Sequence, residues 1–168
     1  VRNDESTTIY RLGTINLNDG TLLTPLVTNN DGVIRGAGTI DAALVVNNGD
    51  IRNAAAVANL RERLLFTGTV TNNENIESIG GEMEFKGDVT NNTPDGDVYG
   101  KDAIFRFLGP NGFVNNNRVY LDDTLVWSTN FVNNGSMQVF AGEASTLASD
   151  ITLSGTSILE MQLGNDFS

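Results

Sequence analysis

The sequence lacks two residue types that supply much of protein chemistry. Among its 168 residues there is no cysteine and no histidine. The first absence excludes disulfides and thiol chemistry. The second removes the commonest general base and the commonest transition-metal ligand. No run of 18 or more apolar residues is present, so we expect no membrane insertion.

Positive charge is scarce. Ten Lys and Arg stand against 21 Asp and Glu, which gives a formal net charge of −11 and a pI near 4.2. The basic residues are scattered and form no cluster along the chain. Because an acidic surface repels phosphate backbones, we expect no nucleic-acid partner.

The most informative feature is a repeat. Residues 66–73 (FTGTVTNN) and 85–92 (FKGDVTNN) share six of eight letters, 19 positions apart. An apolar residue, any residue and then Asn-Asn recurs six times along the chain. The first asparagines of the six pairs are Asn29, Asn47, Asn72, Asn91, Asn115 and Asn133. Their spacing of 18 to 25 residues is typical of repeat architectures.

Apolar residues alternate on both sides of the asparagine pair. Stepping back by twos from Asn72 gives Val70, Gly68 and Phe66, and the same step from Asn133 leads through Phe131 to Trp127. Period two predicts strands with one buried face. An apolar residue also follows three positions after the second asparagine in five copies, for example Val33. Each repeat is therefore a strand, a two-asparagine turn, a second strand and a leg of variable length.

These units predict a right-handed parallel β-helix, because stacking is what gives a single strand-turn-strand unit a buried core. We expect one domain over residues 1–168, about eight coils of 18–25 residues, with degenerate terminal coils at 1–26 and 141–168. The first asparagine of each pair should point inward and form a hydrogen-bonded ladder. The second should take a left-handed conformation at the corner.

Two alternatives stay open. The stretch Ala54–Arg63 has helical propensity and predicts a short helix or a long loop between coils. An antiparallel sandwich would also explain the alternation of apolar residues, but it would not explain an inward asparagine repeated six times.

The segment from Gly36 to Ile51, with GAGTI followed by LVVNNGDI, resembles a repeat of secreted bacterial surface proteins. Such repeats occur in autotransporter passenger domains, filamentous-haemagglutinin-like adhesins and surface proteins with a C-terminal sorting anchor. The resemblance implies an all-β solenoid, an extracellular or bacterial cell-surface location and a role without catalysis.

Acidic residues supply the candidate metal and catalytic groups. Asp95, Asp97 and Asp102 are candidate calcium ligands, because calcium favours several oxygens from a flexible loop. The alternative is an acidic solubilising loop that loops out before Val98. Apart from this calcium ion we expect no cofactor. The pair Asp122-Asp123 near Arg118 could serve glycoside chemistry, but adjacent strand residues point to opposite faces, so we expect no catalytic residues.

Aromatic residues divide into two groups. Phe66, Phe85, Phe131 and Trp127 fall on the inward register and predict a stacked core. Tyr99, Tyr120 and the run Phe105-Arg106-Phe107 would form a glycan-stacking surface if they were exposed together.

The function expected from these features is a non-catalytic structural or adhesive module of a bacterial surface protein. It would be a rigid rod whose partners are neighbouring repeats or further copies, joined head-to-tail into filaments. The alternative is a carbohydrate-binding or polysaccharide-degrading β-helix.

Overall fold

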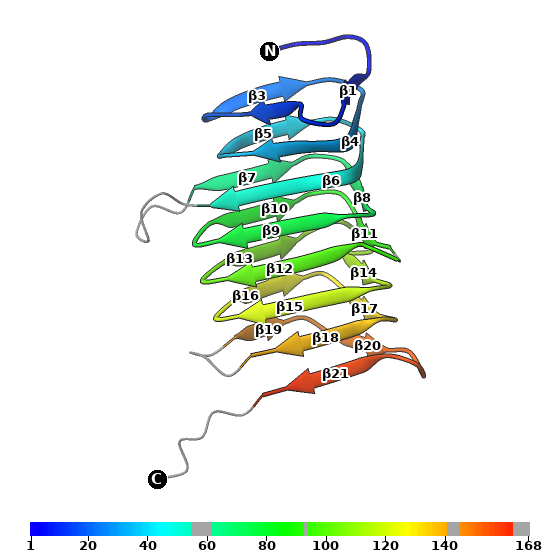
Figure 1. The fold of residues 1–168 in the computed structure, drawn as a ribbon. Helices are drawn as coiled ribbons and strands as arrows, with labels where there is room; N and C mark the ends of the chain where they lie inside the picture. The colour runs from blue at the N-terminus through cyan, green and yellow to red at the C-terminus, as the bar shows by residue number, and fades with distance from the viewer. Residues whose placement is uncertain (55–61, 93, 141–144, 163–168) are drawn as a thin grey trace.

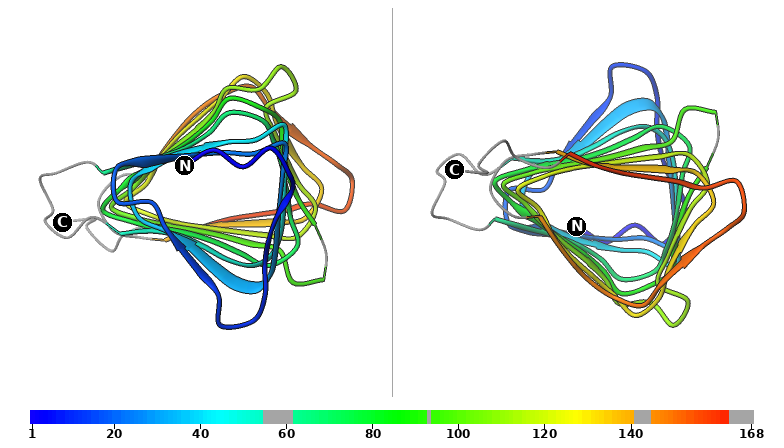
Figure 2. Two further views of the ribbon diagram at one scale, coloured as in Figure 1. Left: turned by 90° about the horizontal axis from the view of Figure 1, so that it is seen from above. Right: turned by 90° about the horizontal axis from the view of Figure 1, so that it is seen from below.

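The computed structural model describes residues 1–54, 62–92, 94–140 and 145–162, and within them every regular element is a β-strand. The strands form one 14-stranded and one seven-stranded sheet, and all their pairings are parallel. The result is the expected β-solenoid, wound as a right-handed coil around a vertical axis in Figure 1. Seen along that axis, the coils have a three-sided outline (Figure 2).

Each side of this outline is a face formed by equivalent strands from successive coils. The first face is the seven-stranded sheet: β3 Gly20–Leu23, β5 Gly38–Asp41, β7 Arg63–Phe66, β10 Glu82–Phe85, β13 Ile104–Phe107, β16 Leu125–Ser128 and β19 Thr146–Ala148. The second face contains β1 Thr7–Ile9, β8 Thr69–Asn72, β11 Val89–Asn91, β14 Phe113–Asn115, β17 Phe131–Asn133 and β20 Ile151–Leu153. The third face contains β2 Thr14–Asn16, β9 Asn75–Ile79, β12 Asp97–Lys101, β15 Arg118–Asp122, β18 Ser136–Val139 and β21 Ile158–Met161. The long strands β4 Leu26–Arg35 and β6 Leu44–Ala54 run through the corner between the second and third faces.

The seven strands of the first face correspond to about seven turns rather than the eight expected. At the N-terminal end, only a single bridge from Arg2 to Leu23 extends the first face beyond β3. Neither of the terminal segments, 1–26 and 141–168, carries an Asn-Asn pair. The expected helix or loop around Ala54–Arg63 falls mainly on residues 55–61, which lie outside the described residues.

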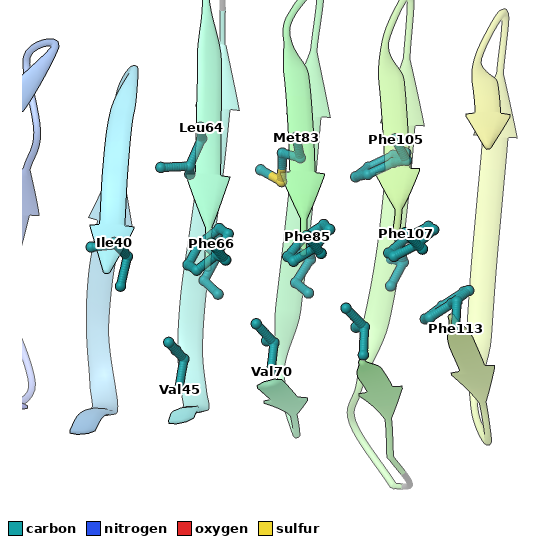
Figure 3. Packing of buried hydrophobic residues seen from close by; sticks show 14 of the residues in the cluster. Ile40, Val45, Leu64, Phe66, Val70, Met83, Phe85, Phe105, Phe107 and Phe113 are labelled. Atoms are coloured by element: carbon teal, nitrogen blue, oxygen red, sulfur yellow. The ribbon is translucent and has the colours of Figure 1, made fainter. Parts of the chain in front are cut away.

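The core is a column of stacked aromatic rings (Figure 3). The rings of Phe66 and Phe85 lie 5.1 Å apart between centroids, and those of Phe85 and Phe107 lie 5.2 Å apart. The column continues across to the second face, where Phe113 lies 4.3 Å from Phe107 and Phe131 lies 5.0 Å from Phe113. All five side chains are at most 1% exposed, so the expected aromatic core is confirmed for Phe66, Phe85 and Phe131.

The inward position expected for Trp127 is wrong, because this side chain is 46% exposed. In β16 the inward residue is Val126, which pairs with the buried Phe105. Four positions separate the inward residues Phe66 and Val70, but the corresponding corner after Ser128 is one residue shorter. Alternation therefore does not carry through a corner, because the backbone there is not an extended strand.

The glycine of the repeat lies in this corner. Gly68, Gly87 and Gly109 stack on one another in successive coils, and a Cβ on any of them would overlap backbone atoms of the coil above. A side chain does not fit at this approach, which explains why FTG and FKG share the glycine.

A second correction concerns Val33, expected to point inward. The inward residue is Ile34, which is fully buried, and Val33 is half-buried. The pairing of β4 with β6 shifts register between Asn30 and Val33, where Asp31 has a φ of 56°. This bulge adds one residue to the corner and moves the next apolar residue to the outer side.

Candidate functional site

The asparagine pairs occupy the corner between the second and third faces. The first asparagine of each pair is fully buried. Its Nδ2 donates to Oδ1 of the equivalent residue in the next coil, at 2.7 to 2.8 Å. Five such bonds link Asn29, Asn47, Asn72, Asn91, Asn115 and Asn133, which we call the inner ladder. The expected ladder is therefore confirmed in all six copies.

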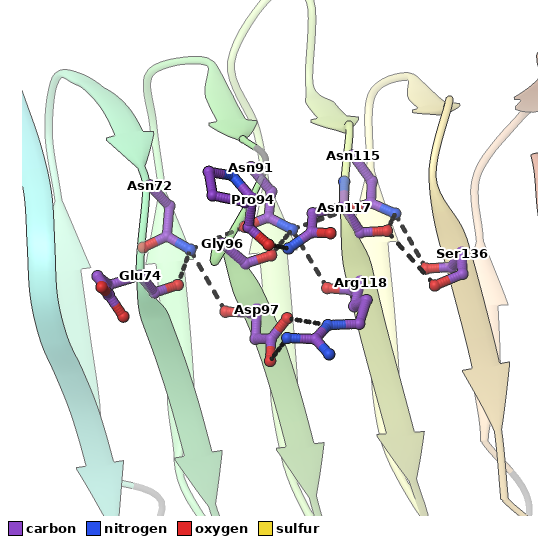
Figure 4. Close-up of polar contacts among 10 residues, drawn as sticks. All are labelled: Asn72, Glu74, Asn91, Pro94, Gly96, Asp97, Asn115, Asn117, Arg118 and Ser136. Carbon is purple, nitrogen blue, oxygen red and sulfur yellow. Dashed lines mark hydrogen bonds and ion pairs between the residues drawn. The ribbon is translucent and has the colours of Figure 1, made fainter.

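Each inner side chain also holds the turn backbone (Figure 4). Asn72 Nδ2 donates to the carbonyl of Glu74 at 2.7 Å, and Asn91 Nδ2 donates to the carbonyl of Gly96 at 2.7 Å. Asn91 Nδ2 additionally lies 3.2 Å from the carbonyl of Arg118 in the next coil. An amide is suited to this role because it offers two donor hydrogens and an acceptor with two lone pairs. The ladder therefore closes the corner and joins the coils at once.

The second asparagines form an outer ladder of their own. Their side chains are half-buried or exposed, and each after the first donates from Nδ2 to Oδ1 of the equivalent residue in the preceding coil, at 2.7 to 3.4 Å. The outer ladder consists of Asn30, Asn48, Asn73, Asn92, Asn116 and Asn134. Its donors point toward the N-terminal end of the solenoid, whereas those of the inner ladder point toward the C-terminal end.

The left-handed conformation expected for the second asparagine is wrong, because none of these residues has a positive φ. Their backbone is instead part of, or directly next to, the paired strands. Sequence reasoning missed the outer ladder, although its signal was present: the second asparagine recurs six times just as the first does.

The candidate calcium ligands do not come together. Asp97 is the first residue of β12 and Asp102 follows its last residue, so roughly 17 Å of strand separates them. Asp97 receives two hydrogen bonds from Arg118, at 2.7 and 2.9 Å, and Asp95 is exposed in the turn before it. The loop inserted before Val98 ends at Gly96, because Asp97 already pairs with Asn75. Val98 then pairs with Ile76, and both side chains are buried. Across residues 1–54, 62–92, 94–140 and 145–162, no three carboxylates converge as a metal-holding group.

Charged side chains on the outer surface pair across neighbouring coils. Besides Arg118 and Asp97, Lys101 lies 3.2 Å from Asp122. The hydrogen bond that Arg118 donates to Asp97 raises the pKa of Arg118, and the one that Lys101 donates to Asp122 raises the pKa of Lys101. The candidate calcium ligand Asp97 and the candidate glycoside-chemistry residue Asp122 are thus each engaged in an ion pair between neighbouring coils.

Two tyrosines lie side by side on the outside of the third face. Tyr99 and Tyr120 are partners in the register of β12 and β15, and both are half-buried. A hollow of about 330 Å³ beside them is lined by Arg52, Glu77 and Asp97, among others.

On the first face, the guanidinium of Arg106 lies 5.2 Å from the ring centre of Trp127. The condition for one surface shared with the tyrosines, that all these residues be exposed together, is not met, because Phe105 and Phe107 are buried in the core. The tyrosines therefore form a surface without them.

Comparison with known proteins finds no matching family model, curated protein or solved structure. In the part of the chain that the structure describes, no helix is long and apolar enough to cross a membrane.

Proposed function

We propose that this chain is a non-catalytic structural module of a bacterial extracellular or cell-surface protein, in which the solenoid serves as a rigid spacer. The observation that carries the proposal is the unbroken inner ladder, whose bonds run through six successive coils without a gap. In a solenoid each coil contacts only its neighbours, so rigidity depends on every interface between coils. Here each of the five interfaces between the six coils that carry an inner asparagine has such a bond.

Other contacts between the coils support the same role. The phenylalanine column fills the core, and ion pairs such as Arg118 with Asp97 bridge rungs on the outside. Support for the location comes from the likeness of Gly36–Ile51 to repeats of secreted bacterial surface proteins. Antibodies against the chain that label intact cells of its source would test this location; labelling only after lysis would contradict it.

The chain has no cysteine, so rigidity can be measured between two introduced ones. Thr21 and Ala148 are exposed, and they occupy the same register column of the first face, six coil steps apart. Spin labels on Thr21→Cys and Ala148→Cys should give a narrow distance distribution centred at about 29 Å, from about 4.8 Å per step, before label length.

The control keeps both labels and adds Asn91→Ala and Asn115→Ala, which remove three consecutive bonds of the inner ladder. We expect a broader distribution in this variant, because the coils on either side lose their link. A distribution as broad in the unmodified rod as in this variant would refute the proposed rigidity.

One observation favours a second candidate function, the binding of glycans. Tyr99 and Tyr120 lie outward on adjacent rungs beside a hollow that has charged hydrogen-bonding groups such as Arg52 and Glu77. Aromatic faces next to polar groups bind sugar rings by stacking and hydrogen bonding. Because the acidic surface disfavours polyanions, neutral oligosaccharides are the appropriate probe.

Calorimetric titration with neutral hexose oligosaccharides tests this second function. Binding should be lost in Tyr99→Ala and Tyr120→Ala and retained in Tyr10→Ala, whose tyrosine is 70% exposed at the N-terminal end. Equal binding in all three variants, or none by the unmodified chain, would remove this candidate.

A further inference from the structure

The C-terminal coil exposes the cross-section of the core. Its strands β19, β20 and β21 lie at the ends of their sheet orders, so each has one edge without a strand partner among the described residues. The inward register positions of β20 and β21 hold Ile151, Leu153, Leu159 and Met161, which are 39% to 62% exposed. One coil earlier, the equivalent Met137 is 2% exposed. Such a concentration of exposed apolar side chains marks an interaction surface.

The N-terminal coil has the reverse shape. Its strands β1 and β2 pair only with β4, so each also presents an open edge within the described chain. The end of the coil is hollowed, with a volume of about 540 Å³ lined in part by Thr7, Ile15, Leu17 and Leu22. Ile9 and Leu17 are already nearly covered, in contrast to the apolar residues at the other end. A hollow therefore lies at one end and projecting apolar side chains at the other.

The two terminal coils also share a corner that differs from those between them. Ile9 pairs with Asn29 and Leu153 pairs with Asn133, so an aliphatic residue takes the inner-ladder position at each end. From that residue to the next inward apolar residue there are six positions in both terminal coils, from Ile9 to Ile15 and from Leu153 to Leu159.

In four of the internal coils, the corner does not match this spacing. The corresponding step is four positions at Asn47, Asn72, Asn115 and Asn133. The corners of the two terminal coils therefore match each other, both in the six-position spacing and in the aliphatic residue at the ladder position. They differ in both respects from the corners of these four internal coils.

From these observations we propose that the C-terminal coil of one copy docks on the N-terminal coil of a second copy, with Leu153 over Ile9 and Leu159 over Ile15. In this register Ile151 lies over Thr7, and Met161 lies over Leu17 in the hollow. The open edges of β20 and β21 then continue into β1 and β2 as parallel ladders of the kind found throughout the molecule. The two surfaces are different, so the contact is heterologous and repeats without closing, which makes a filament.

This head-to-tail contact deepens the structural function proposed above and rests on it, because a filament subunit must itself be a stable rod. A contact between two C-terminal ends would be the rival arrangement. It would pair the edges in antiparallel orientation, leave the N-terminal hollow empty and make no use of the matching corners.

Four single variants, used alone and in mixtures, test the proposal by analytical ultracentrifugation. Leu159→Glu places a charge in the C-terminal surface, and Ile15→Glu places one in the N-terminal surface. The controls are their outward neighbours on the same strands, Ile158→Glu and Thr14→Glu, whose side chains are exposed. Circular dichroism melting of each variant shows that the rod itself is folded.

The unmodified chain should sediment at multiples of 18.0 kDa that increase with concentration. Both controls should behave like it. Leu159→Glu and Ile15→Glu should each associate roughly 10- to 100-fold more weakly, as expected from the burial of one large aliphatic side chain. An equal mixture of Leu159→Glu and Ile15→Glu has one intact end on each partner, so it should form a dimer and stop there.

Three results would overturn the proposal. If Ile15→Glu alone still dimerises, the contact lies between two C-terminal ends. If the mixture stays monomeric while each variant is folded, the two surfaces do not recognise each other. If the unmodified chain is monomeric but a chain ending at Gln162 associates, residues 163–168 cover the surface. In each case a narrow spin-label distance would leave the rigid spacer standing, so the two proposals fail separately.

Discussion

The substitution Asn91→Ala tests how much one rung of the inner ladder contributes. Asn91 is fully buried and makes four side-chain hydrogen bonds. It donates to the carbonyl of Gly96, to Asn115 Oδ1 and to the carbonyl of Arg118, and it accepts from Asn72 Nδ2.

The magnitude follows from which of these partners keep another bond. Asn72 Nδ2 retains the carbonyl of Glu74 at 2.7 Å, and Asn115 Oδ1 retains the amide of Asn117 at 3.2 Å. The carbonyl of Gly96 is buried and, without the asparagine, keeps only the backbone N–H of Arg118 at 3.5 Å, which leaves it close to unsatisfied. One unsatisfied buried group costs about 1 to 3 kcal/mol, and each lost ladder bond costs about 1 kcal/mol. We therefore expect Asn91→Ala to lower the free energy of unfolding by roughly 3 to 5 kcal/mol.

The adjacent Asn92 provides a matched control, since it is the same residue type in the outer ladder. Its bonds to Asn73 and Asn116, of 2.9 and 3.4 Å, lie where water can replace them. Asn92→Ala should therefore lower stability by about 0.5 to 1 kcal/mol. Equal losses in the two variants would refute the argument that burial makes the inner ladder the stabilising one.

Urea unfolding followed by circular dichroism measures the loss of stability in both variants. The two losses can be compared if the dependence of the unfolding free energy on urea concentration is the same in each variant as in the unmodified chain. Because solenoids can unfold in parts, hydrogen exchange should also show the loss concentrated in the coils that contain Asn72, Asn91 and Asn115.

The isosteric substitution Asn91→Asp sharpens the same prediction. A carboxylate would face three acceptor oxygens, on Gly96, Asn115 and Arg118, without a hydrogen to donate. Its pKa in the folded state should therefore rise, and stability should fall as pH increases through the window between the unfolded and folded pKa values. Thermal melts should show Asn91→Asp less stable than Asn91→Ala near neutral pH and partly recovered in acid; a flat difference would contradict the geometry.

Three further changes probe other parts of the rod. Phe107→Ala interrupts the ring column at its centre and should lower the free energy of unfolding by about 3 to 5 kcal/mol in urea titrations. Gly68→Ala should strongly destabilise the rod, because its Cβ would overlap the coil above, whereas Gly155→Ala, with open space around it, should leave the melting temperature unchanged. Desolvation, followed by the charge of Asp95 and other nearby carboxylates, raises the pKa of Glu74 above its usual value. The folded state thus binds the proton more tightly, so stability should fall as pH rises from 4.5 through that raised pKa, and Glu74→Gln should flatten melting temperature against pH there.

The sequence was sufficient to predict the coil, the inner ladder and the stacking of Phe66 on Phe85, because these depend on a pattern that repeats in every copy. It misplaced Trp127 and Val33 for one common reason. Period two holds within a strand, but a corner that gains or loses one residue reverses which side chains point inward. Corner length is set by how the chain fits onto the coil above, and that fit is a contact between residues about 20 positions apart.

The sequence by itself determined that identical residues lie over one another, because a stacked repeat brings each residue next to its own copy and asparagine can bond to asparagine. Only the tertiary structure decided what lies outside the repeat. It separated Asp97 from Asp102 along one strand, brought Tyr99 beside Tyr120 on the outer surface, and left the apolar ends open. These placements depend on the winding of the chain around a common core, where the packing of every coil fixes the position of the next.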